Sequence, residues 1–437
     1  MWSHPLSKRS VKFIEIIVQL FLILLVIRAF EIEGVAFFRM AVLGVVGFVV
    51  HALIAVRYRL PFFLGLSLCA MVVVFGVISS LWLLMIGLFL IGFLFLPLRF
   101  RTHILLLTLL GLGLALVRAK AGALLASAEW SRHLLKILPI AGSIFMFRMV
   151  LFLYDREHDR KRYDEPKATV FLRTLSYFFL LPNFCFPLFP LVSYEGFKRT
   201  YFNDDALVIY QTGVRRIFFG LLQILAGRVV YQYMAIDPSE VVTSLGLFRY
   251  LTADYLFYMK TTGQFDLCIG MLCLFGFNLP KPTNFYFLAA NFLETWRRGN
   301  IYWKDAMLRL VYNPVYFQFR HFGKAKALVI ATLVVFLTTF VLHFYQWFWI
   351  RGDVSITLPD VLNWTVLGLL VIATSLYQSN RKPKAPRKPS QRVILQIVKT
   401  FGTMTVMSIL FSMWASRSLP TWISTITFGR FVWHEMP

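Results

Sequence analysis

Charged residues are scarce in this 437-residue sequence, at 15% of the total, whereas a soluble domain carries roughly 25%. Hydrophobic residues make up 58% of the chain, and the mean hydropathy is +0.68. The apolar residues recur from residue 13 to residue 433 in blocks, many of them near the length of about 20 residues that a bilayer-spanning helix needs. This composition excludes an ordinary cytosolic enzyme, a disordered protein and a secreted disulfide scaffold. It predicts an all-α, polytopic integral membrane bundle.

Acidic residues and cysteines are also few. The chain has 45 Lys and Arg against 21 Asp and Glu, which gives a formal charge of +24. The basic residues stand between the apolar blocks, as they do in cytoplasmic loops of membrane proteins. They do not form a basic stripe on a soluble module, so we expect no nucleic acid partner. The four cysteines lie within apolar stretches and indicate neither a disulfide framework nor a metal site.

The apolar blocks predict about 11–13 helices. The uncharged stretch 60–98 is long enough for two spans with a break near Ser79 and Ser80, and the stretch 242–278 adds one or two more. The other predicted spans are 13–30, 36–56, 103–117, 134–154, 169–191, 206–234, 327–350, 361–378 and 393–414. The region 278–326 is amphipathic and too polar to span, and we expect interfacial and re-entrant helices there.

Loop charges predict the orientation of the bundle. If the spans alternate, the basic pairs after the second and fourth spans and the mixed-charge run 155–167 after the sixth fall on one side. The run 381–392 has six basic residues interleaved with prolines, which is typical of an extended linker. By the positive-inside rule, we expect these loops in the cytoplasm.

His343 is the candidate catalytic residue, because it lies within the uncharged stretch 327–350, and an ionisable group inside a span is a functional candidate. The alternative is a histidine that makes a helix–helix hydrogen bond. A neutral imidazole in an apolar tunnel suits general-base activation of a hydroxyl. Asn300 is the candidate polar group that orients a substrate or stabilises an oxyanion. Its alternative role is a helix cap or turn residue.

Several ordered motifs surround these two residues. In NFLETWRRGNIYW (291–303), Trp296, Arg297 and Arg298 form a Trp-Arg-Arg triplet two residues before Asn300. His343 follows in an apolar stretch. TTGQFDLCIG (261–270) and FGFNLP (275–280) precede them, and SYFFLLPNFCFPLFPLVSYEGF (176–197) lies further upstream.

This ordered set resembles the membrane-bound O-acyltransferase family over roughly residues 170–380. The 291–303 segment is similar to the family's Asp-Phe-Trp-Arg-Arg-Trp-His block, with Glu294 in place of Asp and Asn300 where members have His or Asn. Lys260, Thr295 and Gly299 depart from the family pattern, which bears on substrate contacts rather than on the fold. The resemblance implies N-terminal transmembrane helices (1–168), a catalytic core (169–380) and a basic loop with a C-terminal helix (381–437).

The resemblance further implies helices around a central tunnel and O-acyl transfer in the cell inner membrane. The acyl donor would be acyl-CoA or the phosphopantetheine arm of an acyl carrier protein, with no bound cofactor, and the acceptor a hydroxyl of an envelope glycan or lipid. Among the bacterial members of this family, the sequence resembles the teichoic-acid D-alanyl and alginate acetyl transferases. By this resemblance His343 and Asn300 are catalytic. The residues assigned to substrate binding are Trp296, Arg297, Arg298, Tyr302 and Gln346.

Asp266 and Glu294 are expected to be structural and to pair with Arg297, Arg298 or Lys260, because an unpaired charge inside the bundle is costly.

Two other functions of the protein stay open. One is a transporter or flippase of an envelope precursor, which an inverted hydropathy repeat would favour; the sequence shows none. The other is a non-catalytic membrane partner with the same fold.

Overall fold

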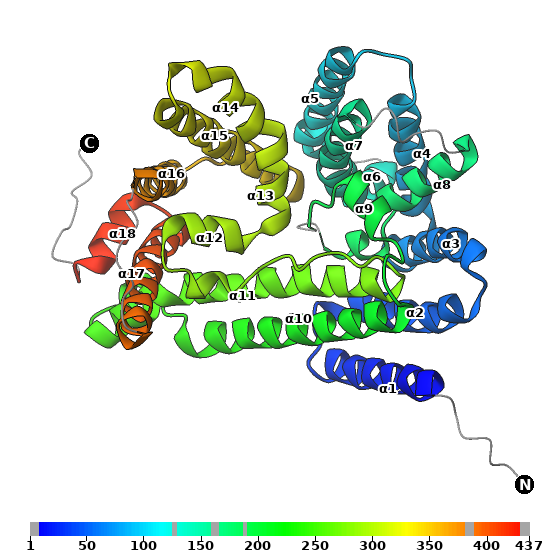
Figure 1. The fold of residues 1–437 in the computed structure, drawn as a ribbon, viewed down its shortest axis with the longest axis horizontal. Helices are drawn as coiled ribbons and strands as arrows, with labels where there is room; N and C mark the ends of the chain where they lie inside the picture. Colours follow the sequence, from blue (N-terminus) through cyan, green and yellow to red (C-terminus); the bar gives the residue numbers. More distant parts are fainter. Residues whose placement is uncertain (1–7, 125–128, 159–165, 187–189, 381–388, 429–437) are drawn as a thin grey trace, which may run out of the picture. The chain divides into compact units, whose positions relative to one another are not determined.

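The computed structural model describes residues 8–124, 129–158, 166–186, 190–380 and 389–428. Regular structure within these ranges is helical, apart from one isolated antiparallel bridge between Tyr201 and Phe277 (Figure 1). The prediction of an all-α fold is confirmed.

Ten helices of the described residues are long and apolar enough to cross a membrane, so this is a multi-pass membrane protein. One of them is continuous across three segments, α6 (Glu129–Pro139), the π-helical η1 (Ile140–Phe145) and α7 (Met146–His158). The other nine are α1 (Lys8–Ala29), α2 (Gly34–Leu53), α3 (Val56–Phe75), α4 (Val77–Leu94), α5 (Phe100–Leu124), α10 (Ala206–Met234), α15 (Lys324–Arg351), α16 (Leu358–Asn380) and α17 (Pro389–Ala415).

The prediction of a span at 169–191 is wrong. Helix α8 (Lys167–Phe178) has 12 residues, which is about 18 Å of helix against a hydrocarbon core of about 30 Å. The chain then turns into the short η3 (Leu181–Phe184), with Pro182 in its first turn, and α9 (Tyr194–Thr200). Proline has no N–H to continue a helix, which explains why this apolar stretch does not form one long helix.

Two other boundaries differ from the expectation. The break in 60–98 lies at Gly76, whose φ of +79° favours glycine, and Ser79 and Ser80 fall inside α4. The stretch 242–278 forms one helix, α11 (Ser244–Leu274), of 31 residues. It is not among the ten apolar helices, since it carries charges along its length, Asp254, Lys260 and Asp266 among them.

The region 278–326 folds into a series of short helices. They are η5 (Tyr286–Leu288), α12 (Phe292–Gly299), α13 (Ile301–Met307), the π-helical η6 (Leu308–Tyr312), α14 (Asn313–Phe319) and η7 (Arg320–Phe322). Two further short helices are η4 (Pro238–Glu240) and α18 (Leu419–Ile426).

The chain forms two compact units, each assembled from separate segments. The first unit combines residues 1–221, 264–280 and 345–353, and the second combines 222–263, 281–344 and 354–437. This division cuts across the three sequence ranges implied by the resemblance. His343 belongs to the second unit, whereas Gln346, three residues later on α15, belongs to the first.

In the first unit, the fully buried Arg148 of α7 holds the end of α8. Its guanidinium donates to the carbonyl oxygens of Tyr177 (2.9 Å) and Phe178 (3.3 Å) and to Oδ1 of Asn183 (3.1 Å). A helix end leaves carbonyl groups without intrahelical partners, and a buried end needs such donors. Arg148 therefore stabilises the abrupt end of α8.

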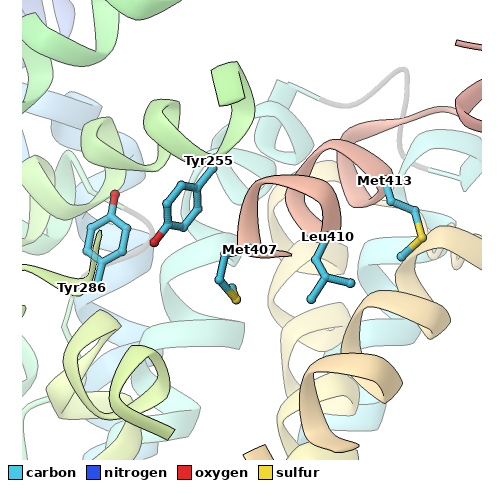
Figure 2. Packing of buried hydrophobic residues seen from close by; sticks show 5 residues of the cluster. All are labelled: Tyr255, Tyr286, Met407, Leu410 and Met413. Carbon is cyan, nitrogen blue, oxygen red and sulfur yellow. The ribbon is translucent and has the colours of Figure 1, made fainter. Parts of the chain in front are cut away.

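In the second unit, aromatic and sulfur-containing side chains join α11 and η5 to α17. Figure 2 shows the ring of Tyr255 between Tyr286 and Met407, with Leu410 and Met413 farther along α17. The two tyrosine rings meet edge to face at 5.7 Å, an arrangement that aromatic pairs prefer. This cluster packs α17 against α11 and η5.

Candidate functional site

The ring of His343, on α15, lies against two tryptophans from the following helices. Its centre is 5.4 Å from the Trp364 ring on α16 and 5.3 Å from the Trp414 ring on α17. The two indoles meet edge to face at 6.0 Å. We call His343, Trp364 and Trp414 the histidine cage. His343 is half-buried, so the cage shields the imidazole without enclosing it fully.

Asp360 fixes the orientation of Trp414. The indole Nε1 of Trp414 donates to Oδ1 of Asp360 at 2.7 Å. The second oxygen of Asp360 accepts from the backbone N–H (2.8 Å) and the hydroxyl (2.6 Å) of Thr357, and the Asp360 backbone N–H donates back to the Thr357 hydroxyl at 3.3 Å. This reciprocal pattern is a capping box at the start of α16. Trp414 is therefore anchored to the first turn of the neighbouring helix.

Asn300 is the N-cap of α13, as its alternative interpretation proposed. Its side-chain oxygen accepts from the backbone N–H of Trp303 at 3.0 Å. The cap uses the oxygen of the side chain, whereas orienting a substrate carbonyl would use its N–H groups. The structural role and the proposed catalytic role are compatible.

A hydrogen bond connects the helix that Asn300 begins to the helix that carries His343. The Nε1 of Trp303 donates to the hydroxyl of Thr339, one turn before His343, at 3.2 Å. The Trp296 ring packs against Phe336, a further turn away, at 4.7 Å. The Trp-Arg-Arg segment and α13 thus pack on α15 within the second unit.

The predicted pair between Glu294 and Arg298 is present, with N and O atoms 2.9 Å apart. Glu294 also accepts from the backbone N–H of Ala290 at 3.4 Å, and Arg298 donates to the carbonyl of Leu288. Both side chains thereby hold the entry to α12. Arg297 is exposed. Burial, together with Tyr316, raises the pKa of Tyr312, and the charge of Arg297 opposes this shift in part.

Asp266 forms an ion pair with Arg216, which was not among the three partners expected from the sequence. The two atoms are 3.3 Å apart, and the side chains are 9% and 22% exposed. Near this ion pair the helices α10 and α11 lie close together. A Cβ added at Gly213 would be only 2.8 Å from the carbonyl oxygen of Gly270. An intramembrane arginine of the 206–234 span is paired in this way.

The remaining predicted site residues are placed as follows. Tyr302 is buried on α13, at 7% exposure, and Gln346 is half-buried on α15 in the first unit. Trp364, Trp414 and Asp360 were missed by the sequence analysis. Within the described ranges, no group of three His, Cys, Asp or Glu side chains could hold a metal ion.

Comparison of the sequence with protein-family models and with curated proteins found no match.

Proposed function

We propose that this protein is a membrane-bound O-acyltransferase, with His343 as the general base and Asn300 as the residue that orients the reacting carbonyl. The observation that supports this proposal is the arrangement around His343. The imidazole is half-buried between two indoles, and the helix that Asn300 caps is hydrogen bonded to α15 one turn away.

The chemistry requires only these groups and the two substrates. The imidazole accepts the proton of the acceptor hydroxyl as its oxygen bonds to the thioester carbonyl carbon. A side-chain N–H of Asn300 donates to the oxyanion that forms. When the carbon–sulfur bond breaks, the imidazolium returns the proton to the leaving thiolate. The indoles exclude water, which would otherwise compete as acyl acceptor.

The substrates follow from the membrane setting and the motif resemblance. The donor is acyl-CoA or a phosphopantetheine-linked acyl group on a carrier protein, and the acceptor is a hydroxyl of an envelope glycan or lipid. With Lys324 and Lys326 at the cytoplasmic face, His343 lies seventeen residues further along α15, or roughly 25 Å. A long thioester arm from the cytoplasm and an acceptor from the outer side would meet there. A tilted α15 would instead bring both substrates from the cytoplasm or the lipid.

The test is acyl transfer by purified variants with labelled acetyl-CoA and acetyl-phosphopantetheine carrier protein as donors and extracted envelope glycan and lipid as acceptors. His343→Ala is expected to lower turnover by about 10²–10⁴-fold, the usual contribution of a general base, with unchanged thermal stability in detergent. Asn300→Ala is expected to lower turnover severely, and Asn300→His to retain part of it. The control is His321→Ala, whose ring is exposed on η7 and whose loss is expected to leave turnover unchanged.

The alternatives give different results. Near-wild-type turnover in His343→Ala would leave the histidine as a packing residue and remove the catalytic assignment. Movement of a labelled envelope precursor across proteoliposomes, without acyl transfer, would indicate a flippase. If envelope mass spectra do not change on deletion and neither activity is present, the protein is a non-catalytic partner.

A further inference from the structure

The indole N–H of Trp364 is buried and has no hydrogen-bond partner among the described residues. Buried tryptophan N–H groups usually find a partner, because the group loses its water on burial. Trp364 also packs against the apolar cluster of Met307, Val335, Phe336 and Val371. Its N–H is therefore a donor in an apolar setting, beside the proposed catalytic histidine.

Three other tryptophans of the same unit show that the fold can satisfy this group. Trp414 donates to Asp360 at 2.7 Å, Trp303 to Thr339 at 3.2 Å and Trp422 to Ser412 at 3.1 Å. Trp364 differs from these three because its N–H has no partner among the described residues. Among the four tryptophans, the rings of Trp364 and Trp414 contact His343. The donor left without a protein partner thus belongs to a ring that borders the imidazole.

We propose that Trp364 Nε1–H donates a hydrogen bond to an oxygen of the substrate bound at His343. This inference rests on the proposed function and deepens it. The indole nitrogen is a donor only, so its ligand must present a lone pair. In acyl transfer that ligand is the thioester carbonyl oxygen, which becomes the oxyanion. An acyl chain alone would leave the N–H unsatisfied.

The proposal gives the two indoles of the cage different roles. Trp414, whose N–H is already bonded to Asp360, positions the imidazole through its ring. Trp364 supplies a neutral donor, which acts with the amide of Asn300 on the same oxygen. A hydrogen bond made by a neutral donor in a site of low dielectric is stronger than the same bond in water. A donor without a protein partner also needs no rearrangement before substrate binds.

The test compares Trp364→Phe with the matched variant Trp414→Phe, since each keeps an aromatic ring and removes one N–H. Trp364→Phe removes no hydrogen bond to the part of the chain that the structure describes, so we expect an unchanged unfolding midpoint. We expect kcat to fall at least tenfold with little change in KM, because loss of one oxyanion donor costs on the order of 10²–10³ in kcat. Trp414→Phe leaves Oδ1 of Asp360 without its indole donor, so its unfolding midpoint is expected to fall.

A binding measurement provides a second readout. In protein labelled with ¹⁵N at the indole nitrogens, the Trp364 signal is the one missing in Trp364→Phe. Saturating acetyl-CoA or acetyl-phosphopantetheine carrier protein is expected to shift that signal. An unshifted signal would assign the N–H to an ordered water and overturn the proposal, as would wild-type kcat and KM in Trp364→Phe. If His343→Ala is inactive while Trp364→Phe is unaffected, only this inference fails; if His343→Ala is active, the proposed function fails.

Discussion

At the residue scale, the sequence alone identifies the two catalytic candidates, His343 and Asn300. It does not identify the side chains that surround them. His343 is visible because an ionisable residue stands out in an uncharged stretch. Trp364 and Trp414 are not visible, because a tryptophan in an apolar helix has the composition of any packing residue. Their contact with His343 depends on how α15, α16 and α17 pack. The second role of Asp360 also could not be found from the sequence. Its position indicates a capping residue in the first turn of α16, but it also accepts a hydrogen bond from the Trp414 indole.

Gly276 gives a stability prediction at this scale. Its φ is +91°, and a Cβ there would lie 2.3 Å from the Phe202 ring. The Phe202 backbone N–H donates to the Gly276 carbonyl at 2.7 Å, so the two residues are held together. Gly276→Ala is expected to lower the free energy of unfolding by about 2 kcal/mol, from backbone strain and overpacking.

The measurement for this prediction is unfolding in detergent followed by circular dichroism. Gly402→Ala is the control, because a Cβ at Gly402 meets nothing within 4 Å and the residue is exposed on α17. That variant is expected to be as stable as the wild type or slightly more stable, since alanine favours a helix. Equal stability of Gly276→Ala and Gly402→Ala would contradict the proposed constraint.

At the element scale, helices were predicted well and their ends poorly. A run of about 20 apolar residues identifies a span whatever its packing, so the spans were recognised. The end of α8 was missed because the apolar pattern continues past it. Two features end it: Pro182 in η3, which follows α8 directly, and the buried Arg148 of α7, which caps the α8 carbonyls from another helix. The break at Gly76 has a similar cause, since its backbone conformation is not visible as a change in hydropathy.

The pairing of α10 with α11 is testable through Arg216 and Asp266. Removing the carboxylate by Asp266→Ala leaves a largely buried guanidinium without this partner. We expect a loss of about 2–3 kcal/mol in unfolding free energy and a lower yield of folded protein. The double variant Arg216→Ala/Asp266→Ala is expected to recover part of the loss, because no unpaired charge remains. A well-folded Asp266→Ala protein without acyl transfer would instead assign Asp266 to substrate.

At the scale of the whole molecule, the orientation depends on whether α11 crosses the bilayer. The charged runs 155–167 and 381–392 are described only at 155–158, 166–167 and 389–392. Between them, the apolar candidate spans of the described residues are α10, α15 and α16. Three crossings would place the two runs on opposite sides. The positive-inside rule places both in the cytoplasm. A fourth crossing removes the conflict, and α11 is the candidate, because its 31 residues give about 46 Å of helix.

The pairing of one α11 charge, that of Asp266, lowers the cost of this crossing. Asp266 is paired with Arg216, and the Lys260 backbone packs against Gly227 of α10, so α11 approaches α10 at both positions. With α11 as a span, the described part of the chain crosses the bilayer eleven times. Lys324 and Lys326 then lie at the cytoplasmic start of α15, the geometry that the proposed acyl transfer requires.

Cysteine accessibility tests this topology. In a variant with the four native cysteines replaced by serine, a membrane-impermeant thiol reagent is expected to label Ser239→Cys, in the loop between α10 and α11, from outside intact cells. Ser390→Cys, at the start of α17, is expected to react only after permeabilisation, as is Lys167→Cys at the start of α8. If Ser239→Cys and Ser390→Cys both react from outside, α11 does not cross the bilayer. His343 would then lie on a helix that enters from the outer face, and a cytoplasmic thioester would approach it from the opposite end.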